Sequence, residues 1–206
     1  MLNNLCSKLA DLYAEQGICV KLYVKFRAKL LNLDEYSDFL PKRGVILDIG
    51  CGYGLLSNYL VLHFPARQVI GIDLDQRRIE IASKTVGERE NIGFTLKDAR
   101  GCDLLPCSGA VMVDFLHHLK PTEQQLTLEN IFSSLEKDGT LLIAEIDPTA
   151  EPLRTSYWVD LFLNREKSHF RKPDDWKILL TSIGYKFKII RSPIPFFARI
   201  LYVCQK

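Results

Sequence analysis

The chain has 206 residues, of which 47% are hydrophobic and 25% are charged. This composition is typical of a globular domain and excludes intrinsic disorder, which goes with few hydrophobic residues and a high net charge. The length predicts a single domain, or one domain with a small cap. The formal net charge of +2 is too small to favour binding to a phosphate backbone, so nucleic acid is not an expected partner.

No segment has the pattern of a membrane span or a metal site. The longest uncharged run, Ile49 to Ala66, contains three glycines and a proline, so we do not expect it to cross a membrane. The N-terminal residues lack a basic leader before an apolar segment, which makes the cytoplasm the expected location. The six cysteines show no Cys-x-x-Cys pair and no matching histidine spacing. We therefore expect reduced thiols, no disulfide scaffold and no bound metal.

Residues 1–40 are expected to form one or two helices that make an N-terminal cap on a main domain of residues 41–206. Within this cap, lysines recur every four residues and apolar residues run beside them. The lysines are Lys21, Lys25 and Lys29, and the apolar residues are Leu22, Phe26 and Leu30. Such a stripe is usually a solvated helix face, but it also suits peripheral contact with an anionic membrane surface.

Beyond residue 40, short apolar runs alternate with longer helical patterns, which is typical of an α/β domain. The runs expected as strands are Gly44–Gly50, Gln68–Asp75, Ile92–Asp98, Gly109–Phe115, Gly139–Asp147, Tyr185–Ser192 and Ala198–Gln205. The expected helices are Leu55–Phe64, Gln76–Glu88, Thr122–Lys137 and Asp174–Ile183. A capping pair of Thr122 and Gln125 is expected to open the third of these helices.

The strand patterns also predict how the sheet is built. The first four strands are nearly unbroken apolar runs, as expected where helices cover both faces of a sheet. The last two are joined by the segment SPIPFF, residues 192–197, which is too short for the crossover between parallel strands. We therefore predict a Rossmann-like open sheet of seven strands, mostly parallel, with an antiparallel C-terminal hairpin and helices on both faces.

The strongest motif is VILDIGCGYG, Val45 to Gly54, in which a buried strand passes through a glycine-rich turn into a helix. Glycines let the backbone approach a ligand closely, and the first turn of the following helix presents unpaired N–H groups. Nineteen residues past Gly54, Asp73 closes the second strand, where an acidic side chain can accept hydrogen bonds from a ribose diol. The motif therefore predicts a nucleoside-binding turn.

The third glycine separates two cofactor classes. A dinucleotide fingerprint that starts at Gly50 needs a small residue where Leu55 stands. One that starts at Gly52 needs glycine or alanine where Ser57 stands. Both registers fail, which disfavours a nicotinamide-dependent oxidoreductase but keeps it as an alternative.

The string DIGCGYG instead resembles motif I of the class I S-adenosylmethionine-dependent methyltransferases, and the resemblance covers about residues 44–206. It implies S-adenosylmethionine as cofactor and direct in-line displacement of its methyl group. It implies that Asp48 orders the loop and the methionine end of the cofactor. The residues implied to line that end are Gly50, Cys51, Gly52 and Gly54.

The resemblance implies further contacts along the next strand ends. Asp73 would hold the ribose hydroxyls, with Leu74 against the adenine. Asp98 would accept from the adenine amino group, with Ala99 as a backbone donor beside it. Asp114 and Phe115, which close the fourth strand, match the segment beneath the sulfonium that faces the acceptor.

A general base is useful where the acceptor is a hydroxyl or a protonated amine, and two histidines follow the fourth strand. The segment Leu116–His118 resembles the LHH of many small-molecule methyltransferases. We expect His117 to be the base, with His118 as the second candidate. Glu145 or Asp147 is expected to orient the imidazole. A structural or substrate-shaping pair is the alternative. A divalent site made by Asp114, Glu145 and Asp147 also stays open.

The acceptor is expected to be a small molecule or lipid-like. No [DNS]-P-P-[YFW] string follows the fourth strand, where enzymes that methylate base or amide nitrogens carry it; VDFL stands there instead. Specificity is expected from the N-terminal helices, from Glu151–Pro173 and from the SPIPFF segment. A catalytically silent subunit that binds the cofactor and a partner is a further alternative. The acceptor's identity, the oligomeric state and the pathway do not follow from the sequence.

Overall fold

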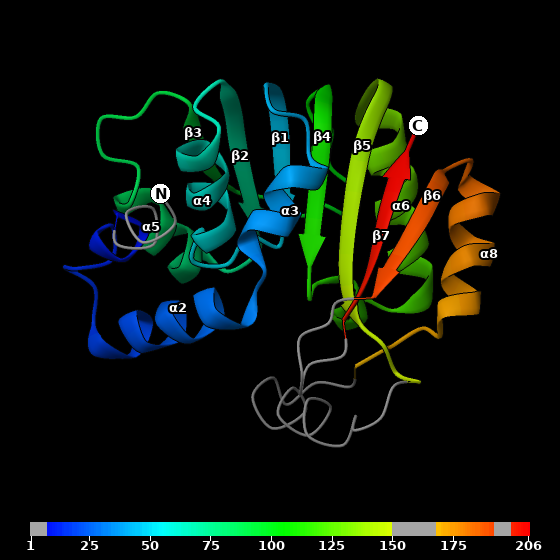
Figure 1. The fold of residues 1–206 in the computed structure, drawn as a ribbon, viewed down its shortest axis with the longest axis horizontal. Coiled ribbons are helices and arrows are strands. Elements are labelled where there is room, and N and C mark those ends of the chain that lie inside the picture. The colour runs from blue at the N-terminus through cyan, green and yellow to red at the C-terminus, as the bar shows by residue number, and fades with distance from the viewer. Residues whose placement is uncertain (1–7, 150–167, 192–198) are drawn as a thin grey trace.

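The computed structural model describes residues 8–149, 168–191 and 199–206 of the chain. A seven-stranded sheet lies at its centre (Figure 1), with the spatial order β3-β2-β1-β4-β5-β7-β6. The strands are β1 (Gly44–Ile49), β2 (Arg67–Asp73), β3 (Ile92–Leu96), β4 (Cys107–Val113), β5 (Leu135–Ile146), β6 (Lys186–Arg191) and β7 (Arg199–Gln205). The first five strands are parallel, and β7 is antiparallel to both β5 and β6. The predicted fold class is confirmed.

Helices cover both faces of this sheet. They are α2 (Ile18–Leu30), α3 (Leu33–Phe39), α4 (Leu55–His63), α5 (Gln76–Lys84), α6 (Pro121–Ser134) and α8 (Pro173–Ile183), with a short 3₁₀ helix η1 (Leu116–His118) after β4. Successive side chains of a strand point to opposite faces. Accordingly, Ile46 of β1 packs in one core cluster with α2, α3 and α4, whereas its neighbour Leu47 packs in the other with α6 and α8.

The order of the strands changes direction at β1. From β1 the chain continues outward to β2 and β3, whereas β4 and β5 lie on the opposite side of β1. Such a reversal opens a crevice outside the carboxyl ends of the central strands, where open α/β sheets bind ligands. Helix α2 lies at the lower left of Figure 1, below α4 and α5, on the side of the sheet toward which β4 points.

The junction between α6 and β5 differs from the prediction. Helix α6 ends at Ser134 and β5 begins at once at Leu135, four residues earlier than expected. Leu135 is buried and pairs with Cys107, and the register then shifts before Gly109. Burial of this leucine in the sheet outweighs the helical pattern of the residues after it.

The predicted capping pair at the start of α6 is wrong. Pro121 occupies the first helical position, which suits a residue without an N–H. The carboxylate of Glu123, rather than Gln125, accepts a hydrogen bond from the backbone N–H of Lys120 at 2.9 Å. The helix therefore begins one residue earlier than expected.

A buried arginine joins the N-terminal helices to the sheet. The side chain of Arg67, at the start of β2, is 1% exposed and donates hydrogen bonds to the backbone oxygens of Ser37, Leu40 and Pro41. Burial lowers the pKa of its guanidinium to about 10. These contacts place α3 firmly on the sheet, while the division into two units at residue 40 stays a prediction.

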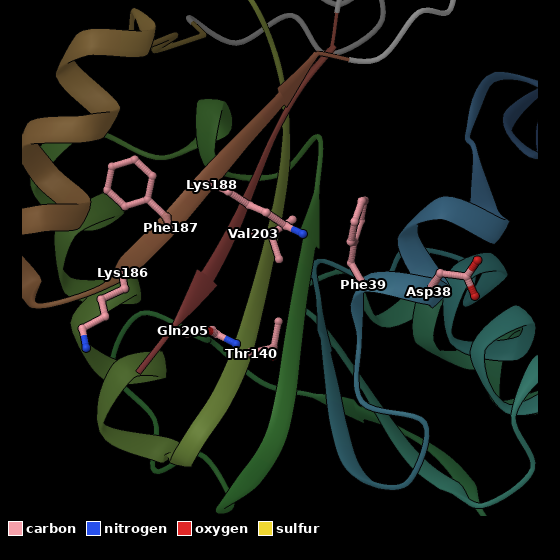
Figure 2. A pocket seen from close by; sticks show the side chains of 8 residues that line it. All are labelled: Asp38, Phe39, Thr140, Lys186, Phe187, Lys188, Val203 and Gln205. Carbon is pink, nitrogen blue, oxygen red and sulfur yellow. The ribbon is translucent and has the colours of Figure 1, made fainter.

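A groove of about 440 Å³ lies on the face of the sheet next to α3. Figure 2 shows Phe39 of α3 on one side of it and Lys188, Val203 and Thr140 of the sheet on the other. Thr140 belongs to the amino-terminal half of β5, so the groove lies away from the carboxyl-end crevice. None of the helices within the described residues is both long and apolar enough to cross a bilayer.

Candidate active site

The glycine turn between β1 and α4 is held against β2 and against the segment that follows β4. The N–H of Gly50 donates to the oxygen of Ile72 at 2.8 Å. Gly50 has a φ of +75°, and a Cβ on it would lie 2.4 Å from the Phe115 ring. Only glycine fits this position, because both the backbone conformation and the close ring exclude a side chain. The turn and Phe115 are therefore packed as one unit.

Gly52, unlike Gly50, has open space where a side chain would lie. Its φ is +54°, and a Cβ placed on it would meet no atom within 4 Å. Its N–H donates to Oδ2 of Asp73 at 2.8 Å, while Oδ1 of Asp73 accepts from the N–H of Asp75 at 2.9 Å. An open face beside a fixed carboxylate is the arrangement that a nucleoside with a ribose diol requires. These residues fit the adenosyl part of S-adenosylmethionine.

Asp48 lies beneath the turn and is 3% exposed. Its Oδ2 accepts a hydrogen bond from the Ser57 hydroxyl at 2.5 Å. Burial raises the pKa of Asp48 to about 6; the Ser57 hydrogen bond opposes this rise and the Asp73 charge adds to it. Burial and the same two carboxylates, Asp48 and Asp73, hold the pKa of the Cys51 thiol well above its ordinary value, so Cys51 stays protonated near neutral pH.

At the end of β3, an arginine that the sequence reasoning did not single out holds Asp98. The guanidinium of Arg100 donates to both oxygens of Asp98 and to Oε1 of Glu123 on α6. The hydrogen bonds from Arg100 keep the pKa of Asp98 below its usual range. Ala99 is buried and Leu74 is 55% exposed. The adenine contacts of Leu74, Asp98 and Ala99 stay predictions.

Asp114 sits in a buried group of charges directly after β4. Its φ is +51°, and its carboxylate accepts from Arg27 of α2 at 2.7 Å and from Arg199 of β7 at 2.5 Å. Burial opposes the ionisation of Asp114, but the charges of Arg199 and Arg27 outweigh it and hold the pKa of this carboxyl well below its ordinary value. Asp114 therefore joins the N-terminal helix, the fourth strand and the last strand at the crevice.

The carboxylate of Glu145 organises the residues after β4. Its Oε1 accepts from the backbone N–H groups of Phe115 and Leu116, at 3.2 and 2.7 Å. Its Oε2 lies 2.6 Å from Nδ1 of His117, and both side chains are 2% exposed. With Nδ1 protonated toward the carboxylate, Nε2 carries the lone pair of the neutral imidazole. Of the two acidic residues expected to orient a histidine, the structure pairs Glu145 with His117.

The two histidines lie side by side. The ring centroids of His117 and His118 are 4.1 Å apart, and the His117 ring stacks on Phe170 at 4.7 Å. His118 is partly exposed, whereas His117 is buried. The backbone N–H of His169 donates to the oxygen of His117 at 2.7 Å, which attaches the segment before α8 to this site. His117 thus contacts the segment expected to shape specificity through both its backbone oxygen and its ring.

The predicted residues form two neighbouring groups. Asp48, Gly52 and Asp73 lie together at the glycine turn, and the Phe115 ring against Gly50 joins this group to Asp114, His117 and Glu145. Of the segments predicted to set specificity, the N-terminal helices are described as α2 and α3. Most of Glu151–Pro173 and all of SPIPFF lie outside the described residues.

Three carboxylates left open as metal ligands have other partners. Asp114 accepts from two arginines and Glu145 from His117, as described above. Asp147 accepts from the N–H and hydroxyl of Thr149, at 2.9 and 2.6 Å. In the three described stretches, no group of three or more His, Cys, Asp or Glu side chains is placed to hold a metal ion.

Sequence comparison identifies a family for this chain. A family model described as a methyltransferase domain matches residues 23–188. The chain is 35% identical over 156 residues to malonyl-[acyl-carrier protein] O-methyltransferase of Legionella pneumophila, an alignment that covers 73% of this chain and 52% of the relative. The chain spans about half the length of the curated relatives it matches. This family match replaces the nicotinamide-dependent alternative.

Solved structures agree on the fold. A methyltransferase dependent on S-adenosylmethionine from Methanosarcina mazei has a TM-score of 0.64 at 21% identity, covering 82% of this chain and 95% of that one. Magnesium protoporphyrin IX methyltransferase from Synechocystis, solved with bound S-adenosylhomocysteine, has a TM-score of 0.71 at 16% identity, covering 97% and 93%. At these identities the likeness concerns the fold.

Proposed function

We propose that this chain, which belongs to the methyltransferase-domain family and uses S-adenosylmethionine, methylates a small-molecule or lipid-like acceptor that loses a proton in the reaction. The observation that carries this proposal is the Glu145–His117 pair, buried next to the residues that hold the glycine turn. An acceptor hydroxyl or protonated amine needs a base to become a good nucleophile, and a positioned base contributes about 10²–10⁴-fold to the rate.

The cofactor-binding half of the site follows from the glycine turn. The open face of Gly52 leaves room for the ligand, and Asp73 presents a carboxylate already oriented by two backbone N–H groups. Asp48 supports the turn from below through Ser57. When bound, S-adenosylmethionine supplies an electrophilic methyl group on a sulfonium. The protein then has to align the nucleophile and exclude water, which accounts for roughly 7–11 kcal/mol in well-oriented reactions.

The acceptor-facing half follows from Glu145. By accepting from the N–H groups of Phe115 and Leu116, it sets the backbone that carries both histidines. By accepting from Nδ1 of His117, it directs Nε2 to take the acceptor proton and stabilises the imidazolium that forms. His118, with partial exposure beside it, is the second candidate for the same role.

The relatives help to choose the acceptors to test. One relative is named for methylating malonyl-[acyl-carrier protein], and one structural neighbour for methylating magnesium protoporphyrin IX. Each name describes the activity of that protein alone. These names and the buried His117–Glu145 pair support testing mainly acceptors that are methylated on oxygen.

The test has two independent parts. Titration calorimetry with S-adenosylhomocysteine measures cofactor binding, and transfer of labelled methyl from S-adenosylmethionine to a panel of alcohols, phenols, amines and hydroxyl-bearing lipids measures the reaction. We expect binding and transfer to at least one panel member, with loss of transfer in His117→Ala. Transfer to protein or RNA substrates with none to the panel would contradict the proposed acceptor class.

A further inference from the structure

The outward side of α2 carries a row of exposed apolar side chains. Ile18, Leu22 and Phe26 recur every four residues and are 65%, 60% and 54% exposed. On the opposite side of the same helix, Val20 and Val24 are buried in the core. Helix α2 therefore has apolar residues on two opposite sides. Exposure of the outer row to water is unfavourable.

A row of basic side chains runs beside the apolar one. Each lysine follows a member of the apolar row by three residues, which places it next to that member on the helix surface. The lysines are Lys21, Lys25 and Lys29, and all three are exposed. Lys21 donates to the backbone oxygen of Ala14 at 3.1 Å, and α2 contains no acidic residue. The outer surface of α2 thus combines an apolar row with an unbroken positive row.

The inner side of α2 contacts both halves of the active site. The ring of Tyr23 packs edge-on against Tyr53 of the glycine turn, with centroids 5.2 Å apart. Arg27 forms its ion pair with Asp114 at the end of β4. Figure 1 shows α2 along the edge of the sheet where these strands end. Whatever the outer side of α2 touches is therefore one helix diameter from the site.

We propose that α2 docks this enzyme onto an anionic lipid surface, with Ile18, Leu22 and Phe26 in the interface and the three lysines over lipid head groups. A helix with a basic row beside an apolar row binds in this way, through buried apolar area and attraction to anionic lipids. An acidic protein partner is less well matched, because the apolar row lies along one convex helix whose Ile18, Leu22 and Phe26 are all more than half exposed.

Docking would also bring the active site close to the bilayer. Because the inner side of α2 contacts Tyr53 and Asp114, docking would bring these residues close to the bilayer, directly behind the bound helix. A lipid-like acceptor would then have only a short distance to travel to the site. The catalytic advantage of docking rests on the proposed function, whereas the docking itself depends only on α2.

Co-sedimentation of the whole chain with vesicles tests the docking. One set of vesicles contains phosphatidylcholine alone, and the other contains phosphatidylcholine with phosphatidylglycerol. The double variant Leu22→Ser/Phe26→Ser removes two apolar members, and Lys21→Gln/Lys25→Gln removes two charges. Matched controls are Leu126→Ser on α6 and Ile178→Ser on α8, which are 54% and 71% exposed away from α2.

We expect the unmodified chain and both controls to sediment with the anionic vesicles and to stay in solution with the neutral ones. Each double variant should bind about tenfold more weakly or worse, and added salt should release the unmodified chain. Recovery of the unmodified chain in the supernatant with anionic vesicles, or equal binding by the apolar double variant, would overturn the proposal. So would a shift from dimer to monomer in that variant, because the row would then bind a second copy.

Calorimetry and a water-soluble acceptor separate this inference from the proposed function. Both double variants should bind S-adenosylhomocysteine as the unmodified chain does, which shows that they are folded. Vesicle binding without methyl transfer to any panel member would sustain the docking and contradict the proposed function. Transfer to a soluble acceptor without vesicle binding would sustain the proposed function and contradict the docking.

Discussion

Oε2 of Glu145 lies 2.6 Å from Nδ1 of His117, and the two side chains are only 2% exposed. The other oxygen of the same carboxylate accepts from the backbone of Phe115 and Leu116. One side chain on β5 therefore sets both the backbone after β4 and the orientation of the imidazole.

Replacing His117, the proposed base, should affect turnover and leave cofactor binding intact. We expect His117→Ala to lower kcat by about 10²–10⁴-fold, with the affinity for S-adenosylhomocysteine nearly unchanged. Glu145→Gln should lower kcat as well and shift its pH dependence, because the imidazolium loses its carboxylate partner. Steady-state kinetics across pH, with calorimetry as the control for folding, measures both. Unchanged turnover of His117→Ala with every accepted substrate would remove this residue from the mechanism.

Two glycines of the turn should respond to mutation in different ways. Gly50→Ala should destabilise the fold by about 1–3 kcal/mol or more, because its Cβ would lie 2.4 Å from the Phe115 ring. Gly52→Val should cost only the strain of its positive φ, about 1–2 kcal/mol, but should fill the open face and weaken S-adenosylhomocysteine binding. Urea unfolding and calorimetry on both variants check this. Equal loss of affinity in two equally stable variants would contradict the assignment of Gly52 to the ligand face.

Neutralising Asp114 should destabilise the protein strongly at neutral pH. Asp114→Asn leaves Arg199, which is 4% exposed, without its carboxylate, and breaking a buried pair in this way costs about 3–5 kcal/mol. In the unmodified chain, the pKa of Asp114 is depressed, so its contribution is fully present above the ordinary carboxyl pKa and is lost as the pH falls below about 4. The urea midpoints of the two proteins should therefore converge in acid. A constant difference down to low pH would contradict this.

Asp48 should produce a pH dependence of the opposite sign. Because its pKa is raised to about 6, the folded protein holds a proton that the unfolded chain releases near pH 4. Stability should therefore fall as the pH rises between about 4 and about 6, by on the order of 2 kcal/mol. Asp48→Asn should remove this decrease. Urea titrations of both proteins at several pH values measure it, and an identical slope in the variant would show that another group is responsible.

Much of the fold was predictable because its signals are local. Alternating apolar runs mark the strands, and the short connection before β7 predicts the hairpin. The spacing of the glycine motif from Asp73 predicts the cofactor turn. At the α6–β5 junction the local signal is misleading, because burial of Leu135 in the sheet decides where the strand begins. Nothing local in the sequence marks Arg27 or Arg199 as partners of Asp114.

The sequence by itself determined the order of the strands and helices, the glycine turn, and the acidic residues at successive strand ends. Each of these depends on residues close together in the chain. Tertiary structure alone decided which side chains meet: Arg27 and Arg199 lie 87 and 85 residues from Asp114 along the chain. The physical reason is that these ion pairs depend on β5 lying between β4 and β7 and on α2 packing at the sheet edge, which residue spacing does not encode.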